Sequence, residues 1–555
     1  MRLENGRRHY TRSSRPSTIA ITTLIFLLTG AIALGRGESK HKKPGRSVPA
    51  PRAIAALQTA PAPASVQVAV QVPAALASFP FDSQRFLNVP PNFTISVYAR
   101  VDNARRLAFA PNGDLLVSQP GDGGVSLIRS NPGGAPSVFT YVSGLRDPHG
   151  VAFHTIQNTT YVYISESNRI DRYVYNTGDT AAHDRQVVVA NLPDGSTPGL
   201  SGYEHPLKNI TLDSNDKLYV QIGSSCNVCT EDAASTPVRA AIYQYNADGT
   251  GGRLFAMGLR NAEGLAILPG STDLWVVVNE RDDIAYPFND STGQYGQVIP
   301  SYVDNHPPDE FTRVVDGGNY GWPFCDPDPD TASGFDNMPF DNDFQMNQGG
   351  LFDCAAMNRI SKGIPGHSAP LSLTFLLGTG FSQIYQDGAV VCLHGSWDRQ
   401  AKTGYKVAYF PWNDSAAAPG AQIDLINGWL DSASQQEWGR PVDSAVDAAG
   451  NLYVSDDLSG TIYELSPTPS QSPPPAPVIT AATKQDKNIV VTGQNFDAGA
   501  VVLINGQPVK TVIRGAPNTL VAKKGIKLIP HGQTANLQVK DSSGTLSAAF
   551  PFTRQ

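Results

Sequence analysis

Six stretches of the chain repeat one pattern of apolar and polar positions. Each begins with a short apolar strand, continues through a turn rich in Gly, Asp or Asn, and ends with a second apolar strand that leads into a polar loop. The repeats begin at Leu107, Val151, Ile210, Leu265, Leu373 and Ser444. Short strands that recur in this way are typical of propeller blades. The pattern therefore predicts an all-β chain with a six-bladed β-propeller, in which residues 302–366 form an inserted loop near one face.

Changes in composition divide the rest of the chain. The propeller is predicted over residues 79–467, between a Pro/Ala-rich disordered linker at 36–78 and a Pro-rich linker at 468–477. Residues 1–35 join several arginines to an uncharged apolar run, which is typical of a signal peptide or of a retained N-terminal membrane anchor. Both alternatives place the body of the protein outside the cytoplasm, secreted or periplasmic.

The C-terminal residues 478–555 lack the propeller repeat. Short alternating strands separated by tight turns predict a small β-sandwich. The elements Gly493-Gln-Asn-Phe496 and Ile504-Asn-Gly506 resemble those of immunoglobulin-like IPT/TIG domains. That resemblance implies a spacer or interaction module instead of a second catalytic unit.

Composition and charge narrow the class of partner. The chain has 41% hydrophobic and 16% charged residues, which is ordinary for a protein with large cores. Its formal net charge of −7 and the absence of a long basic run argue against a nucleic-acid partner.

The five cysteines fit an oxidising compartment. Cys226 and Cys229 have no second ligand pair at the spacing of a zinc site, so a local disulfide is favoured over a redox couple. Cys325 and Cys354 flank an irregular loop that they can staple. Cys392 lies in an apolar strand and is predicted to be a buried free thiol.

The repeat also predicts where polar side chains gather. The loop that enters the first strand of a blade and the loop that leaves the second strand lie on the same face of a propeller, so both line one mouth. The entering loops supply Arg105, Arg106, Arg146, His149, His205, Lys208, Arg260, Asn261, Glu263, His367, Arg440 and Asp443. The leaving loops supply Glu166, Ser224, Glu280, Arg281, Asp282, His394, Asp456 and Asp457.

This ring of cations suits a small anionic or polyhydroxylated ligand, and its carboxylates suit a hard cation such as Ca²⁺. Taken singly, polar side chains on loop tips are often solvated or paired with one another. His149 and His154 are expected to be turn or packing histidines instead of ligands.

At these positions the chain resembles the soluble quinoprotein sugar dehydrogenases of the glucose, sorbosone and fungal pyranose types. The resemblance covers the propeller and is carried by Gly258-Leu-Arg-Asn-Ala-Glu-Gly-Leu-Ala266 and His394-Gly-Ser-Trp-Asp-Arg399, with Tyr203-Glu-His205, Asn319-Tyr-Gly-Trp-Pro323 and Gly439-Arg-Pro-Val442. Where glucose-type relatives carry Gln-Gly-Pro this chain has Glu280-Arg-Asp282, and Val442 replaces a second arginine. These differences favour the sorbosone/pyranose branch.

The resemblance implies a sugar as substrate, pyrroloquinoline quinone (PQQ) and Ca²⁺ as cofactors, and an external electron acceptor such as a cytochrome. It implies that His205 is the general base and that Arg260 stabilises charge on the quinone carbonyl. It also assigns Arg260, Asn261, His367, Arg399, Arg440 and Lys208 to cofactor binding, and the Glu280-Arg281-Asp282 loop to the metal, partly through backbone carbonyls.

Two other functions stay open on this fold class. A metal-dependent lactonase would need a carboxylate-rich metal centre on the channel axis, whereas the predicted ring is mainly basic. A binding propeller without chemistry, which attaches to a carbohydrate or a surface, is the third alternative.

Overall fold

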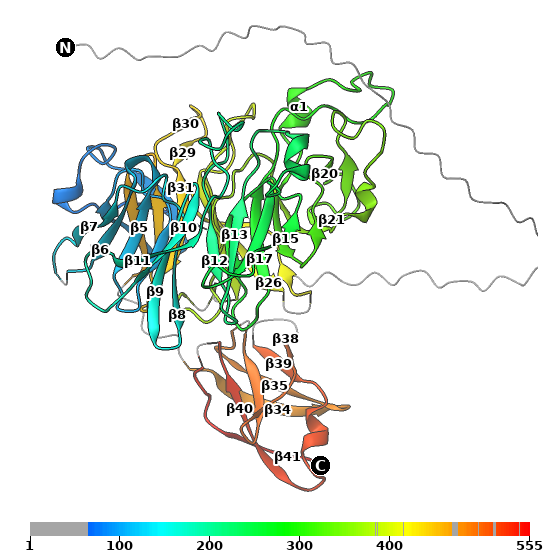
Figure 1. Cartoon of the computed structure of the whole chain (residues 1–555). Coiled ribbons are helices and arrows are strands. Elements are labelled where there is room, and N and C mark those ends of the chain that lie inside the picture. Colours follow the sequence, from blue (N-terminus) through cyan, green and yellow to red (C-terminus); the bar gives the residue numbers. More distant parts are fainter. Residues whose placement is uncertain are drawn as a thin grey trace, which may run out of the picture. The chain divides into compact units, whose positions relative to one another are not determined.

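The computed structural model describes residues 65–131, 133–382, 384–385, 387–413, 416–468, 476–497, 499–513, 518–542 and 544–555, and these are almost entirely strands and turns (Figure 1). The predicted signal peptide or anchor, most of the first linker and most of the second linker lie outside these residues. Across the described ranges, no helix combines the length and apolar character needed to cross a membrane.

Six sheets of four or five strands follow one another through the described part of residues 93–467. The first sheet contains β4 (Leu107–Phe109), β5 (Leu115–Gln119), β6 (Gly124–Arg129) and β7 (Ser137–Ser143), and the second contains β8 (Val151–Ile156), β9 (Thr159–Glu166), β10 (Arg169–Val174) and β11 (His183–Val189). The third sheet contains β12 (Ile210–Leu212), β13 (Lys217–Ile222), β14 (Ala241–Asn246), β15 (Arg253–Met257) and β19 (Gly318–Asn319), and the fourth contains β16 (Asn261–Ile267), β17 (Leu274–Asn279), β18 (Asp309–Val314), β23 (Ile360–Ile364) and β21 (Asp336–Met338). The fifth sheet contains β24 (Thr374–Phe375), β25 (Gly388–Leu393), β26 (Lys406–Asn413), β27 (Ala418–Pro419) and β28 (Ile423–Ile426), and the sixth contains β31 (Pro441–Val446), β32 (Leu452–Asp456), β33 (Thr461–Pro467) and β3 (Phe93–Arg100). Most strands of each sheet follow one another along the chain, but β19 of the third sheet comes from residues beyond β18, and the sixth sheet adds a strand from the start of this region.

Each predicted repeat coincides with the first two strands of one sheet. In the first repeat, β4 and β5 pair antiparallel, and Gly113 supplies the positive φ of +89° that the connecting turn requires. Residues 115–118 of β5 are all buried, whereas β3 alternates strictly between buried and half-buried positions. The inner strands are therefore covered on both faces, and the outer strand β3 on one.

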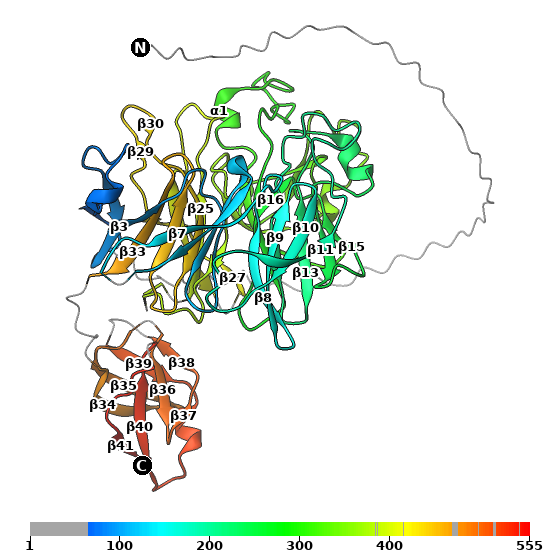
Figure 2. The ribbon, with the colours of Figure 1, turned by 60° about the vertical axis from the view of Figure 1, so that its left-hand side comes forward.

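The buried apolar side chains lie between neighbouring sheets. Separate clusters join the first sheet to the second, and so on to the fifth and sixth, and a further cluster that includes Leu107, Val117 and Tyr453 joins the sixth sheet back to the first. Within the sixth sheet, β3 pairs with β33 from the far end of the chain, with Ile95 opposite Leu465. The described sheets thus form a closed ring held by packing and by one pairing of distant strands. Figure 2 shows β3 beside β33.

Two predictions about the loops are wrong. Residues 302–366 are more than an inserted loop, because they supply β18, β23 and β21 to the fourth sheet and β19 to the third. The first linker does not extend to residue 78 as an unstructured segment, because β1 (Val66–Ala69) pairs with β2 (Phe86–Val89). The alternating valines of β1 are enough to form an edge strand, which the surrounding Pro/Ala composition concealed.

The C-terminal residues form two four-stranded sheets. One has the order β34 (Val478–Gln485), β35 (Asn488–Gln494), β39 (Thr519–Ala522) and β38 (Thr511–Ile513), and the other β37 (Gln507–Pro508), β36 (Val501–Ile504), β40 (Thr534–Lys540) and β41 (Phe550–Thr553). One apolar cluster contains side chains of both sheets, among them Val491 and Val539. Two sheets with a shared core are the arrangement expected of a sandwich.

Candidate active site

A polar cavity of about 240 Å³ lies where the first strands of several sheets begin and their second strands end. These two ends meet at one edge because the two strands of a hairpin are antiparallel. The cavity is lined by Arg105, His205, Arg260, Asn261, Glu263, Asn279, Glu280, Asp282, Asp309, His367, Ala369, Leu371, His394, Gly395 and Trp397. Nine of these residues were predicted at the mouth from the repeat alone.

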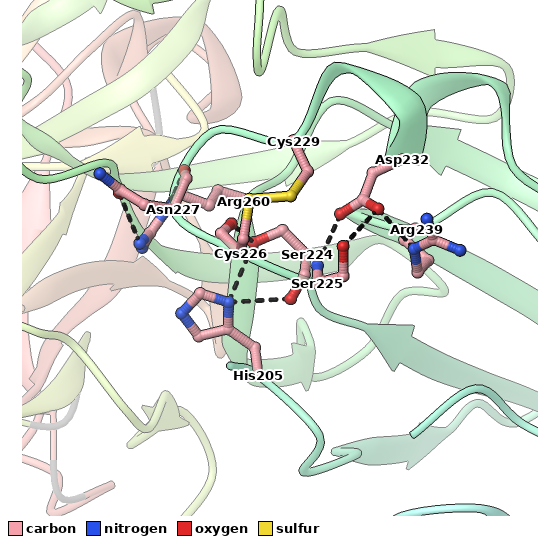
Figure 3. The surroundings of a disulfide bond; sticks show 9 residues. All are labelled: His205, Ser224, Ser225, Cys226, Asn227, Cys229, Asp232, Arg239 and Arg260. Atoms are coloured by element: carbon pink, nitrogen blue, oxygen red, sulfur yellow. Dashed lines mark hydrogen bonds and ion pairs between the residues drawn. A yellow bond between two sulfur atoms is a disulfide. The ribbon is translucent and has the colours of Figure 1, made fainter. Parts of the chain in front are cut away.

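His205, in the segment before β12, is held in one tautomer. Its Nδ1 lies 2.9 Å from both the backbone oxygen and the Oγ of Ser224 (Figure 3). A carbonyl oxygen can only accept, so Nδ1 carries the hydrogen and Nε2 carries the lone pair. Burial, together with the charge of Arg260, lowers the pKa of the His205 imidazole to about 3. The ring is therefore a neutral proton acceptor over the physiological range.

Arg260, just before β16, is fixed almost completely by backbone acceptors. Its Nε donates to the Asn227 oxygen at 3.1 Å, and its Nη1 donates to the oxygens of Glu280 and Asn279 at 2.8 and 3.3 Å. Nη2 donates to Asn227 Oδ1 at 3.0 Å and lies 3.7 Å from Asp282. The guanidinium is thus a rigid, 4% exposed cation at the cavity wall.

Carboxyl groups gather on one side of the cavity. Glu280 is 5% exposed, and neither of its carboxyl oxygens has a hydrogen-bond partner in the described part of the chain. Burial raises its pKa to about 8 and raises that of Asp309, which accepts from the Glu280 and Ala369 amides at 3.0 Å each, to about 6. Buried carboxyl oxygens without partners need a proton or a cation.

A possible ligand set for such a cation adjoins these groups. Ligand atoms of Asp282, His367 and Asp398 all lie within 4.8 Å of one another. His367 Nε2 donates to the oxygens of Val303 and His306 at 2.8 and 3.2 Å, which leaves Nδ1 directed at Asp282, 3.3 Å away. Fixing one imidazole nitrogen by a backbone carbonyl is how proteins orient a metal-binding histidine.

Cations gather around a single carboxylate elsewhere at the site. Asp457 lies 2.7 Å from Arg105, 3.1 Å from Arg440 and 3.0 Å from His394. These neighbours hold the pKa of Asp457 well below its usual range. Two permanent positive charges thus share one negative charge, which leaves a surplus for an anionic ligand.

A buried ionic network forms the base of the cavity. A bulge in β16 separates Asn261 from Gly264, and Glu263 in the bulge bonds His149 Nε2 at 2.8 Å and lies 3.6 Å from Arg106. Arg106 also pairs with Asp443 at 3.4 Å and donates to the backbone oxygens of Glu263 and Leu371. His149 is thus a packing histidine, as expected, and His154 pairs with Asp216 outside the cavity.

The structure brings together His205, Arg260, Asn261, Glu280, Asp282 and His367 in the cavity lining, but not the other predicted ligands. Arg399 donates to the backbone oxygens of Asp304 and Gly366, and Lys208 is fully buried with its Nζ 2.5 Å from the Pro206 oxygen. Arg440 reaches the site only through Asp457. The Arg281 side chain points away and pairs with buried Asp343, so it is a structural cation and no metal ligand.

Sequence reasoning missed several lining residues. Asp309 lies in the stretch interpreted as a loop insertion, and Asn279 is the last residue of β17. Trp397 and Asp398 lie within the His394–Arg399 motif, in which the repeat and the resemblance point only to His394 and Arg399. Trp397 lines the cavity although its side chain is 73% exposed.

The cysteine predictions are confirmed. Cys226 pairs with Cys229 and Cys325 with Cys354, while Cys392 is a buried free thiol. The first disulfide lies directly beside the candidate site, in the loop that contacts both His205 and Arg260 (Figure 3).

Comparison with known proteins gives a family match over the whole ring of sheets. A family model described as TrAA12-like matches residues 87–468. The chain is 24% identical over 421 residues to a pyrroloquinoline quinone-dependent pyranose dehydrogenase of Coprinopsis cinerea, a match that covers 68% of this chain but only 54% of that protein. It is 22% identical to an uncharacterized protein of Borreliella burgdorferi, covering 68% of this chain and 90% of the relative.

Solved structures share the fold. The holo form of the PQQ domain of the Coprinopsis cinerea pyranose dehydrogenase superposes with a TM-score of 0.56 at 21% identity, covering 68% of this chain and 97% of that domain. A calcium structure of a Trichoderma reesei AA12 enzyme gives the same TM-score and identity, with 68% and 96% covered.

Proposed function

Because the chain belongs to the TrAA12-like family, we propose that it is a PQQ- and Ca²⁺-dependent dehydrogenase that oxidises the anomeric hydroxyl or the aldehyde of a sugar. The family match confirms the resemblance to quinoprotein sugar dehydrogenases that the motifs indicated. Identity alone is too low to carry the activity over, so the proposal depends on the site.

The fixed imidazole of His205 beside the fixed guanidinium of Arg260 is the observation that carries the proposal. Oxidation of a sugar hydroxyl removes a proton from oxygen and a hydride from carbon. His205 Nε2, deprotonated and without a partner in the described residues, is placed to accept the proton. When bound, the quinone supplies the acceptor for the two electrons of the hydride.

Arg260 contributes preorganised positive charge. Four of the five N–H groups of its guanidinium have acceptors, so one Nη2 hydrogen remains for an oxygen in the cavity. Because the side chain is already fixed, it stabilises negative charge on such an oxygen without reorganising.

The charge distribution fits a polycarboxylate cofactor bound with a divalent cation. Arg105, which lines the cavity, would hold a cofactor carboxylate, and Arg440 adds positive charge behind it through the shared Asp457. On the acidic side, Asp282, His367 and Asp398 would hold Ca²⁺, and the first two line the same cavity as the unpartnered Glu280. This set retains Asp282 of the predicted Glu280-Arg281-Asp282 loop and adds His367 and Asp398, whereas the Arg281 side chain pairs with Asp343.

Several finer assignments extend this proposal. The six sheets constitute six propeller blades, and the C-terminal domain is of the IPT/TIG type. The substrate is of the sorbosone/pyranose class, and a cytochrome or similar external acceptor removes the electrons. The protein is exported, either free after cleavage or anchored through its N-terminal segment. The ring-shaped packing of the sheets supports the blades, the two-sheet C-terminal core supports the sandwich, and the paired cysteines support export. The substrate class and the acceptor follow from the resemblance of the motifs alone.

Turnover by the reconstituted protein tests the function. The protein is incubated with PQQ and Ca²⁺ and assayed with aldoses, 2-keto aldoses and a dye acceptor, with EGTA as the metal-free control. We expect sugar-dependent dye reduction that EGTA abolishes. His205→Asn should lower kcat by about 10²–10⁴-fold, because it removes the proton acceptor, while PQQ still binds. His154→Asn is the matched control, since this histidine pairs with Asp216 outside the cavity lining.

Other outcomes would point elsewhere. Full turnover in His205→Asn would refute the base assignment. Lactone hydrolysis that needs a metal but no quinone would indicate a hydrolase, and carbohydrate binding without turnover would indicate a binding propeller.

A further inference from the structure

The loop that follows β13 connects the two groups to which the proposed chemistry is assigned. It contains the Cys226–Cys229 disulfide, whose Cα atoms are 5.6 Å apart, and Asn227 lies between the two cysteines (Figure 3). The Ser224 amide donates to the Arg260 oxygen at 2.9 Å, and Ser224 accepts from His205. This one loop therefore contacts both the imidazole of His205 and the backbone of Arg260.

Asn227 makes an unusually complete set of contacts for a half-buried loop residue. Its Oδ1 accepts from Arg260 Nη2 at 3.0 Å and from the Asp282 amide at 2.9 Å, while its Nδ2 donates to the Asp282 oxygen at 3.0 Å. Its backbone oxygen accepts from Arg260 Nε at 3.1 Å. Asn227 thus ties the third sheet's loop to the guanidinium and to the loop that follows β17.

The disulfide closes a short loop that contains Asn227. Without a cross-link, the contacts of Asn227 alone would hold the middle of the segment between Ser225 and Thr230, because in the described part of the chain the side chains of Val228 and Cys229 make no hydrogen bond to another element. At its ends the loop is well anchored. Asp232 accepts from Ser225 N and Oγ at 2.5 and 2.7 Å and from Arg239 Nε at 2.5 Å. The cross-link therefore reduces the conformational freedom of the middle of the loop, which contains Asn227.

We propose that Asn227, held in place by the Cys226–Cys229 disulfide, is a positioning residue for Arg260 and for the 280–282 loop. The proposal rests on the proposed function for its effect on turnover, but its geometric claim concerns the protein without cofactor. A cross-link with only a structural role would support folding and leave turnover per folded molecule unchanged. A positioning role changes the rate, because misplacing a catalytic group by about 1 Å can cost 10²-fold.

The first measurement needs no cofactor. In Asn227→Ala the Asp282 amide loses its acceptor, so hydrogen–deuterium exchange of the peptide spanning 279–284 should become at least about tenfold faster. Asn227→Asp keeps an acceptor oxygen and should restore most of the protection. The double variant Cys226→Ser/Cys229→Ser, which retains Asn227, should lose protection as the alanine variant does.

The second measurement follows turnover. With PQQ and Ca²⁺, Asn227→Ala and the Cys226/Cys229 variant should each lose about 10–100-fold in kcat, with a smaller change in KM for the sugar, and Asn227→Asp should recover most of the loss. The matched control is Cys325→Ser/Cys354→Ser, which breaks a disulfide with the same Cα separation whose cysteines pack in the core between the third and fourth sheets. This control should lower the melting temperature but leave kcat per folded molecule unchanged.

The outcomes separate the two proposals. If wild-type protein oxidises no sugar but Asn227→Ala loses Asp282 protection, the proposed function fails and the positioning role stands. If the Asp282 amide stays protected in both Asn227→Ala and the Cys226/Cys229 variant, or if both keep the wild-type kcat in an active enzyme, the positioning role is overturned.

Discussion

Replacing Arg106 by methionine would remove the cation at the base of the cavity while keeping an apolar stem of similar length. The guanidinium is 4% exposed and pairs with Asp443 at 3.4 Å and Glu263 at 3.6 Å. It also donates to the Leu371 oxygen at 2.7 Å. One side chain thus links the first, fourth, fifth and sixth sheets, so its loss should affect both the stability of the ring and the floor of the site.

The loss of folding free energy depends on the partners that Asp443 and Glu263 retain once Arg106 is removed. Asp443 still accepts from the Leu107 amide at 2.8 Å, and Glu263 still bonds His149, but neither retains a permanent positive partner. Breaking a buried ion pair by removing one member costs about 3–5 kcal/mol. An unfolding entropy of about 2.1 cal/mol/K per residue over roughly 380 residues then gives a fall in Tm of about 4–6 °C.

The effect should depend on pH. Burial already raises the pKa of Asp443, and Arg106 opposes that rise. Without Arg106 the folded-state pKa moves further above the unfolded value of about 3.9, so stability falls as pH rises through the folded pKa. The Tm deficit of Arg106→Met should therefore be larger at pH 8 than at pH 5.

Thermal unfolding followed by circular dichroism at both pH values measures this effect. Arg253→Met is the control, because that arginine pairs with Asp316 on the surface, where both side chains are more than 40% exposed, and should cost no more than about 1 kcal/mol. Adding Asp443→Asn to Arg106→Met should recover part of the loss. A Tm deficit below 1 °C, or an equal deficit at the two pH values, would refute the reasoning.

Three further predictions concern single groups at or near the site. Because burial and Arg260 lower the pKa of His205 to about 3, kcat/KM of the holoenzyme should show no acid limb near pH 6.5; a limb there that His205→Asn abolishes would contradict this. Burial raises the pKa of Cys392 to about 12, so iodoacetamide should alkylate it only after unfolding, as counted by mass spectrometry, and labelling of the native protein would be the contrary result. A Cβ at Gly223 would lie 2.7 Å from His205 Cβ, so Gly223→Ala should displace His205 and lower kcat about tenfold. Gly195→Ala is the control, because there is open space around Gly195, and its kcat should not change. Equal kcat values for the two variants would contradict this prediction.

Local signals explain why so much of the ring could be predicted from the sequence. A hairpin of two apolar strands needs only two short apolar runs and a turn, such as the one around Gly113, and these recur six times along the chain. Antiparallel pairing then places the residues before the first strand and after the second at one edge. For that reason one cavity is lined by His205, Arg260 and His367, although these residues are far apart in the sequence.

Side-chain direction within the loops could not be predicted in the same way. Arg399, Lys208 and Arg281 occupy suitable positions along the chain, but backbone oxygens of neighbouring loops or a buried carboxylate take up their charged groups. A buried cationic side chain points toward the hydrogen-bond acceptors that surround it, and here those acceptors come from segments without a repeat. The sequence pattern contains no information about that choice.

Residues 302–366 show how much of the site depends on such a segment. The oxygens of Val303 and His306 orient His367, and Asp309 fixes the amides of Glu280 and Ala369. These contacts shape the acidic side of the cavity, where Ca²⁺ is proposed to bind. The cationic side, in contrast, comes from Arg105, His394 and Asp457, which belong to the repeats. It follows that Asp309→Asn should alter metal affinity before it alters binding of the cofactor carboxylates, because among the described residues Asp309 contacts the backbone of Glu280 and Ala369 on the acidic side and none of the three cationic-side residues.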